Sequence, residues 1–150
     1  MNVAIVAVDK LREAYLKTGC DLYLQRLRPY FRVDVVETRK ESGVDARALE
    51  GRRILEHVDA IDVVWALDRV GVALSSVELS QRLTQTERSG RRRLVLAIGG
   101  SAGLDDAVLA RADLRWSLSP LTFLHEMARL IALEQLYRAA KISRGEPYHR

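Results

Sequence analysis

The amino-acid sequence predicts a single α/β domain with a mostly parallel sheet and helices on both of its faces. Five short apolar runs, rich in β-branched residues, alternate with segments that carry apolar residues at helical spacing. Several of these runs are apolar in both alternating directions, as strands covered on both faces are. The 150 residues show no repeat, low-complexity tract or linker, so one domain over residues 1–150 is expected.

The expected elements have recognisable boundaries. Pro29 follows the first helix, and Pro120 begins the last one. A capping box of Ser75 and Glu78 opens the third helix, and Gly90 ends it. In chain order we expect a strand over 3–8, a helix over 11–27, a strand over 33–36, a helix over 46–58, a strand over 62–67, a loop through Gly71, a helix between Ser75 and Gly90, a strand over 94–98, a helix over 105–112, a strand over 114–118 and a helix over 120–141.

The last helix is apolar in several directions rather than along one stripe. Glu134, Arg138 and Lys141 form its one polar face, with Glu134 and Arg138 at the i,i+4 pairing distance. A helix this apolar must bury more than one surface. In so small a domain the second surface is expected to be another subunit, which predicts a homodimer. The alternative is a central helix buried on two sides within its own monomer.

Composition restricts the partners and the compartment. The net charge of +4 and the pI near 9.5 favour a polyanionic partner, although each arginine cluster alone is also typical of a solvated surface. Cys20 is the only cysteine and is expected to be a packing residue, without a disulfide. The one apolar run near the start is too short for a membrane span, so we expect a cytoplasmic protein.

Three loops that follow predicted strands are candidates for a ligand site, because ligands bind beyond the carboxyl ends of parallel strands. They cover residues 68–75, 99–104 and 118–123. Gly99, Gly100 and Gly103 in the second loop permit a close approach of backbone to a ligand, or only a tight turn. His125 and Arg129 lie one turn apart beside the third loop. The sequence has no phosphate-binding glycine motif, no serine nucleophile elbow and no metal-ligand spacing.

Four segments together resemble a known family. They are Ala97–Leu104 (AIGGSAGL), Ser117–Phe123 followed by His125, the helix from Arg129 to Ala139, and the ending RGEPYHR over 144–150. In this order they are similar to the ribosomal RNA large subunit methyltransferase H family of SPOUT methyltransferases, over the whole chain. The pattern departs from that family at Leu124, where proline is common, at Glu126, where an uncharged residue is expected, and at Val72, where lysine is usual.

The resemblance implies a SPOUT fold with a C-terminal trefoil knot and an obligate homodimer. It implies that S-adenosyl-L-methionine is bound by the three loops, with contacts from Leu67, Gly99 and residues 118–123, which are Leu118, Ser119, Pro120, Leu121, Thr122 and Phe123. It also implies methylation at N3 of a pseudouridine in helix 69 of 23S rRNA, with the 70S ribosome as substrate, and no metal.

The C-terminal segment is the expected catalytic part. Methyl transfer to an imide nitrogen requires alignment and removal of the N3 proton. His149 could accept that proton, Arg150 could stabilise charge on the base carbonyls, and Tyr148 would anchor the segment. Two other interpretations stay open: a non-catalytic ribosome-associated RNA-binding dimer that uses the basic surface, and a doubly wound protein that binds a small nucleotide.

Overall fold

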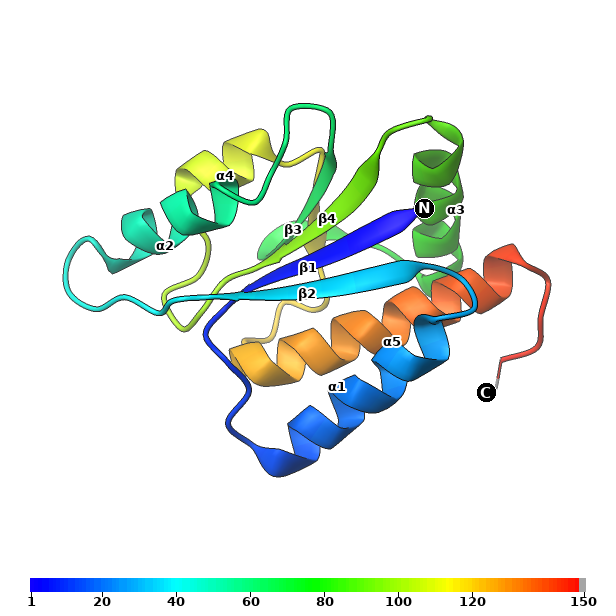
Figure 1. Cartoon of the computed structure of the whole chain (residues 1–150), viewed down its shortest axis with the longest axis horizontal. Coiled ribbons are helices and arrows are strands. Elements are labelled where there is room, and N and C mark those ends of the chain that lie inside the picture. Colours follow the sequence, from blue (N-terminus) through cyan, green and yellow to red (C-terminus); the bar gives the residue numbers. More distant parts are fainter. Residues whose placement is uncertain (149–150) are drawn as a thin grey trace.

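The computed structural model describes residues 1–148, and its centre is a five-stranded parallel sheet in the order β2-β1-β4-β3-β5 (Figure 1). The strands are β1 (Asn2–Val8), β2 (Arg32–Thr38), β3 (Val63–Ala73), β4 (Arg93–Ile98) and β5 (Leu114–Ser117). The helices are α1 (Ala14–Leu27), α2 (Ala46–Leu55), α3 (Ser76–Arg88), α4 (Asp106–Arg111) and α5 (His125–Ser143). The predicted α/β class is confirmed.

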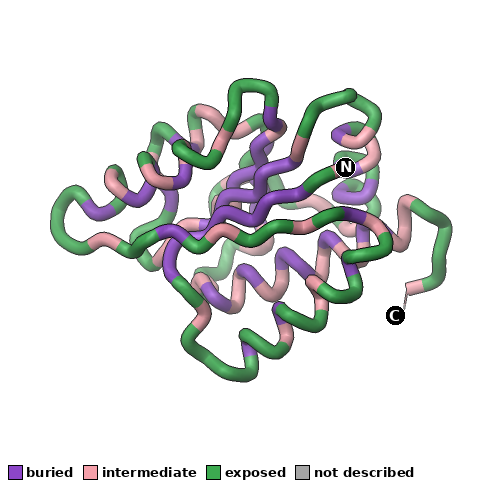
Figure 2. Tube along the Cα trace, viewed as in Figure 1, coloured by how far each residue is buried: buried purple, intermediate pink, exposed green. Residues whose placement is uncertain are grey.

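Strand β1 shows why the sheet needs a helical layer on each face. Ile5 and Val6 are neighbours on β1 and both are completely buried, yet their side chains point to opposite faces. Ile5 packs in the core shared with α1, α3 and α5, whereas Val6 packs in the core shared with α2 and α4. Figure 2 shows the buried central strands between these two layers. Cys20 is buried in the first of these cores, as expected.

Helix α5 packs against α1 on one side and against α3 on the other (Figure 1). Leu133 and Leu136 are each only 1% exposed in this single chain and belong to its core. The prediction that another subunit covers the second apolar surface of this helix is therefore wrong for these two leucines. They are covered by the monomer itself, which is the alternative given above: a central helix buried on two sides within its own chain. The predicted Glu134–Arg138 ion pair is confirmed, with a nitrogen–oxygen distance of 2.6 Å.

Two element boundaries differ from the expectation, and both lie at the site described below. Strand β3 continues past Gly71 to Ala73, because Leu67 and Val72 both pair with Trp116 of β5 and residues 68–71 form an excursion between them. Helix α5 begins at His125 rather than at Pro120, since the side chain of Ser119 accepts a hydrogen bond from the amide of Leu121 and holds a turn there. The other boundaries differ by three residues or fewer.

No helix within residues 1–148 is long and apolar enough to cross a membrane. The trefoil knot stays a prediction, because it depends on how the chain threads through itself, which strand order does not determine.

Candidate active site

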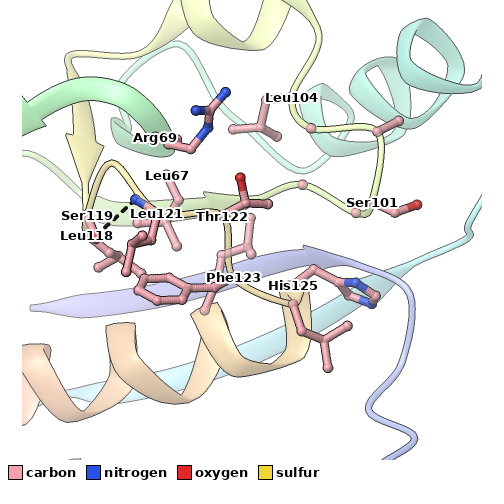
Figure 3. A pocket seen from close by; sticks show the side chains of 17 residues that line it. Leu67, Arg69, Ser101, Leu104, Leu118, Ser119, Leu121, Thr122, Phe123 and His125 are labelled. Carbon is pink, nitrogen blue, oxygen red and sulfur yellow. Dashed lines mark hydrogen bonds between the residues drawn. The ribbon is translucent and has the colours of Figure 1, made fainter.

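The three predicted loops meet at the carboxyl ends of β3, β4 and β5 and enclose one cavity of about 540 Å³ (Figure 3). A volume of this size lies within the range of pockets that bind drug-sized ligands and cofactors. The side chains that reach the cavity are mostly apolar, with a few hydroxyl groups, one histidine and one arginine. Its wall consists of Leu67, Arg69, Ile98, Gly99, Gly100, Ser101, Ala102, Gly103, Leu104, Leu118, Ser119, Leu121, Thr122, Phe123, Leu124, His125 and Ala128.

Seven of the eight residues expected to contact the cofactor line this cavity, and Pro120 is the exception. The seven are Leu67, Gly99, Leu118, Ser119, Leu121, Thr122 and Phe123. The residues come from segments more than fifty positions apart in the sequence, and the parallel sheet brings them to one edge. Figure 3 shows Phe123 and Leu121 on one side of the cavity and Leu104 on the other.

The glycines of the second loop are required by the loop itself. A Cβ atom on Gly99 would lie 2.7 Å from the carbonyl carbon of Gly103, which no side chain tolerates. Gly103 has a φ of 79° and donates its amide to the carbonyl of Gly100 at 3.0 Å, which closes the turn. The two readings left open by the sequence are therefore compatible: the loop is a tight turn, and its bare backbone forms one wall of the cavity.

The excursion between the two halves of β3 is held from three directions. The Asp68 carboxylate accepts the amide of Val70 at 3.2 Å, and the Ser117 hydroxyl donates to the carbonyl of Arg69 at 2.9 Å. Gly71 packs so closely on the backbone of Arg115 that a Cβ atom would collide with its carbonyl oxygen. The excursion therefore has little freedom, and it carries the Arg69 side chain to the cavity (Figure 3).

His125 and Arg129, one turn apart on α5, make separate contacts. Arg129 is 3% exposed and donates to the Glu37 carboxylate at 2.6 Å and to the carbonyl of Asp9 at 2.9 Å, so it ties α5 to β1 and β2. His125 lines the cavity, and its Nε2 atom is buried without a hydrogen-bond partner among the described residues.

Glu126 has a structural role that the sequence does not reveal. It is 4% exposed, and its carboxylate accepts the amides of Arg12 at 2.5 Å and Glu13 at 3.1 Å, just before α1. Burial alone would raise the pKa of Glu126, but these hydrogen bonds and the charges of His125 and Arg129 outweigh it, so the pKa lies below its ordinary value. The carboxylate therefore fastens α1 to the start of α5, which accounts for an acidic residue at this position.

Tyr148, the last described residue of the C-terminal segment, packs against the second half of α5. The Tyr148 hydroxyl donates to Glu134 at 2.8 Å, its ring packs edge-on against Tyr137, and the Arg138 guanidinium lies 4.1 Å from the ring centre. Burial and the bond to Glu134 raise the pKa of Tyr148 well above its ordinary value. Tyr148 is thus attached to α5, as an anchor would be. His149 and Arg150, the other two residues expected to be catalytic, lie outside the described residues.

One chain does not bring this anchor to its own cavity. Ala128 is the lining residue furthest along α5, and Glu134 is the first residue of α5 that contacts Tyr148. The six positions from Ala128 to Glu134 correspond to about 9 Å along the axis of α5. Figure 1 shows the segment after α5 on the side of the molecule away from the start of that helix.

The cavity suits a ligand that combines an apolar body with polar groups. Apolar side chains could enclose an aromatic base, while exposed backbone and the Thr122 and Ser119 hydroxyls could bind sugar and amino-acid groups. Within residues 1–148 no group of three histidine, cysteine or acidic side chains could hold a metal ion. The arrangement fits S-adenosylmethionine, which needs shape and hydrogen bonds rather than a phosphate-binding loop.

Comparison with known proteins defines the class. A family described as predicted SPOUT methyltransferases matches residues 1–149. A structure from Haemophilus influenzae, described as a probable methylase family protein, superposes with a TM-score of 0.58 at 13% identity. The match covers 99% of this chain and 70% of that one, which supports the fold. The chain therefore belongs to the SPOUT methyltransferases, enzymes that use S-adenosylmethionine.

The relatives identify the branch of the family. The ribosomal RNA large subunit methyltransferase H of Moorella thermoacetica is 47% identical, over all of this chain and 99% of the relative. The protein of the same name from Carboxydothermus hydrogenoformans is 44% identical over the full length of both chains. This confirms the family resemblance read from the four sequence segments.

Proposed function

We propose that this enzyme methylates N3 of a pseudouridine in helix 69 of 23S rRNA within the 70S ribosome, with S-adenosylmethionine as the methyl donor. The observation that carries the proposal is the cavity itself, because three loops expected from the sequence to hold the cofactor meet there around about 540 Å³. The names of the full-length relatives support large-subunit ribosomal RNA as the substrate.

The cofactor is proposed to lie against Leu67, Gly99 and residues 118–123. When bound, S-adenosylmethionine supplies a methyl group on a positively charged sulfur. The task of these residues is to bind it, to exclude water and to aim the methyl group at the acceptor nitrogen. Apolar contacts from Phe123 and Leu67 would enclose it, while the bare backbone at Gly99 lets it approach closely.

The acceptor nitrogen carries a proton that must leave as the nitrogen–carbon bond forms and the carbon–sulfur bond breaks. His149 is proposed to accept that proton, and Arg150 to stabilise the negative charge that spreads onto the carbonyl oxygens of the base. Tyr148, which contacts Glu134 and Tyr137, is proposed to anchor the segment that carries them. No metal is required for this chemistry.

The enzyme is proposed to act as a homodimer in which each cavity receives the C-terminal segment of the partner subunit. The contacts of Tyr148 with Glu134 and Tyr137, beyond the part of α5 that lines the cavity, support this arrangement. A C2 dimer would place two equivalent cavities beside two equivalent tails, so both sites would be complete.

Mass spectrometry of ribosomal RNA digests from cells with and without the gene tests this function. Loss of one N3-methylpseudouridine, restored when labelled cofactor, purified enzyme and undermethylated 70S particles are combined, is the expected result. Binding of ribosomes without methyl transfer would support the non-catalytic RNA-binding dimer instead. Methylation of a different nucleotide would retain the enzyme class and overturn the substrate.

A further inference from the structure

Arg69 occupies a special position at the cavity. It is the only lysine or arginine among the lining residues, and its side chain is exposed rather than enclosed. Figure 3 shows its guanidinium beside Leu104, across the cavity from Leu121 and Phe123. A permanent positive charge therefore lies at the solvent-exposed edge of the cavity.

No carboxylate within residues 1–148 neutralises this charge. Fourteen ion pairs occur among the described residues, and none includes Arg69. The neighbouring Asp68 is turned away: one of its oxygens accepts the amide of Val70, and the other is buried. Arg69 is the only cation in the excursion over residues 68–71, and Val72, which follows it, is apolar. An unpaired arginine at such an opening is suited to an anion.

The backbone that carries Arg69 is fixed before any substrate arrives. The Ser117 hydroxyl holds the carbonyl of Arg69, and Gly71 fits against the backbone of β5 without space for a side chain. Only the side chain of Arg69 has to become ordered when it binds, which keeps the entropic cost of the contact small.

We propose that Arg69 binds a phosphodiester group of the substrate RNA at the mouth of the cavity and thereby positions the target nucleotide. This inference rests on the proposed function. The carboxylate of the cofactor is the other anion that could reach the cavity, but S-adenosylmethionine carries a net positive charge, which a nearby guanidinium repels. Each phosphodiester group of RNA carries a full negative charge, and an exposed arginine favours it.

The test compares Arg69→Gln and Arg69→Lys with the wild type in methyl transfer to undermethylated 70S particles. Arg52→Gln is the matched control, because Arg52 is an exposed arginine without an ion pair in the described part of the chain. We expect Arg69→Gln to raise the KM for ribosomes by about tenfold and to reduce the slope of log KM against log salt concentration by about one. Its kcat and its Kd for S-adenosylmethionine should stay within about twofold of the wild-type values. Arg69→Lys should keep the salt slope and recover part of the KM, since it retains the charge.

The alternatives give different results. A weaker Kd for S-adenosylmethionine with an unchanged KM for ribosomes would assign Arg69 to the cofactor and overturn the proposal. An unchanged KM and salt slope in Arg69→Gln would overturn it as well. Failure of the wild type to methylate ribosomes would instead refute the function on which the proposal rests, so the two failures are distinguishable.

Discussion

The hydroxyl of Tyr148 donates to the Glu134 carboxylate at 2.8 Å, and the same carboxylate oxygen accepts from Arg138 at 2.6 Å. One acidic side chain of α5 thus holds both the aromatic anchor and the arginine that lies over its ring. The anchor and the two residues that follow it in sequence can therefore be tested separately, because Tyr148 has defined contacts that contribute to stability.

Deleting His149 and Arg150 should leave the melting temperature and the affinity for S-adenosylmethionine unchanged, while methylation of 70S particles is abolished. The reason is that these two residues are the proposed proton acceptor and charge-stabilising group, whereas the proposed cofactor contacts come from other residues. Tyr148→Phe is the control: it should cost about 0.5–1.5 kcal/mol of stability and retain partial activity, since it loses one hydrogen bond and keeps the ring. Wild-type turnover by the truncated enzyme would show that neither residue is catalytic.

Gly99→Ala should weaken cofactor binding, because the added Cβ would lie 2.7 Å from Gly103 and would force the second loop to open. Gly43→Ala provides the comparison, since Gly43 has a φ of 92° and lies outside the cavity. Strain should reduce the free energy of unfolding of both variants by roughly 1 kcal/mol or more, and both should therefore melt at a lower temperature. Calorimetric titration with S-adenosylmethionine should show a change for Gly99→Ala alone, and equal effects at both positions would contradict the assignment of the loop.

S-adenosylmethionine should stabilise the protein by about 2.7 kcal/mol at a hundredfold excess over its Kd, which a thermal shift measures. NAD and GTP should have no effect, because the cavity has no phosphate-binding glycine motif. A thermal shift with GTP and none with S-adenosylmethionine would refute the cofactor site proposed at Leu67, Gly99 and the third loop. It would favour the nucleotide-binding interpretation.

The sequence predicted the sheet and the three loops well, because apolar runs, caps and glycines are local signals. The element boundaries and residue roles that were predicted wrongly depend on contacts between distant segments. The start of α5 depends on a turn at Ser119 that completes the cavity wall, and the continuation of β3 depends on Trp116 of β5. Glu126 illustrates the same limit: it resembles a surface carboxylate on a helix, and only the fold places it against the amides of Arg12 and Glu13.

Stability should depend on Glu126 in acid. Its pKa in the folded protein lies below the ordinary value of 4.5, so its contribution is present above about pH 4.5 and is lost as the pH falls through the lower folded value. Glu126→Gln should therefore be less stable at neutral pH, by on the order of 1–3 kcal/mol, and should show a smaller loss of stability between neutral pH and acid. Urea unfolding at a series of pH values measures this, with the exposed Glu56→Gln as the control. Parallel curves for the wild type and Glu126→Gln would contradict the capping role.

The dimer can be tested by complementation between two inactive subunits. One subunit carries Gly99→Val and retains its C-terminal segment, and the other lacks His149 and Arg150 and retains its cavity. Co-expression with two different tags and purification on both isolates the mixed dimers. If each cavity uses the partner's segment, a mixed dimer has one complete site and should recover about half of the wild-type activity, although each parent dimer has none. If each cavity uses the segment of its own chain, neither site of the mixed dimer is complete and no activity should return. Sedimentation of the wild type as a monomer at micromolar concentration would exclude the proposed arrangement altogether.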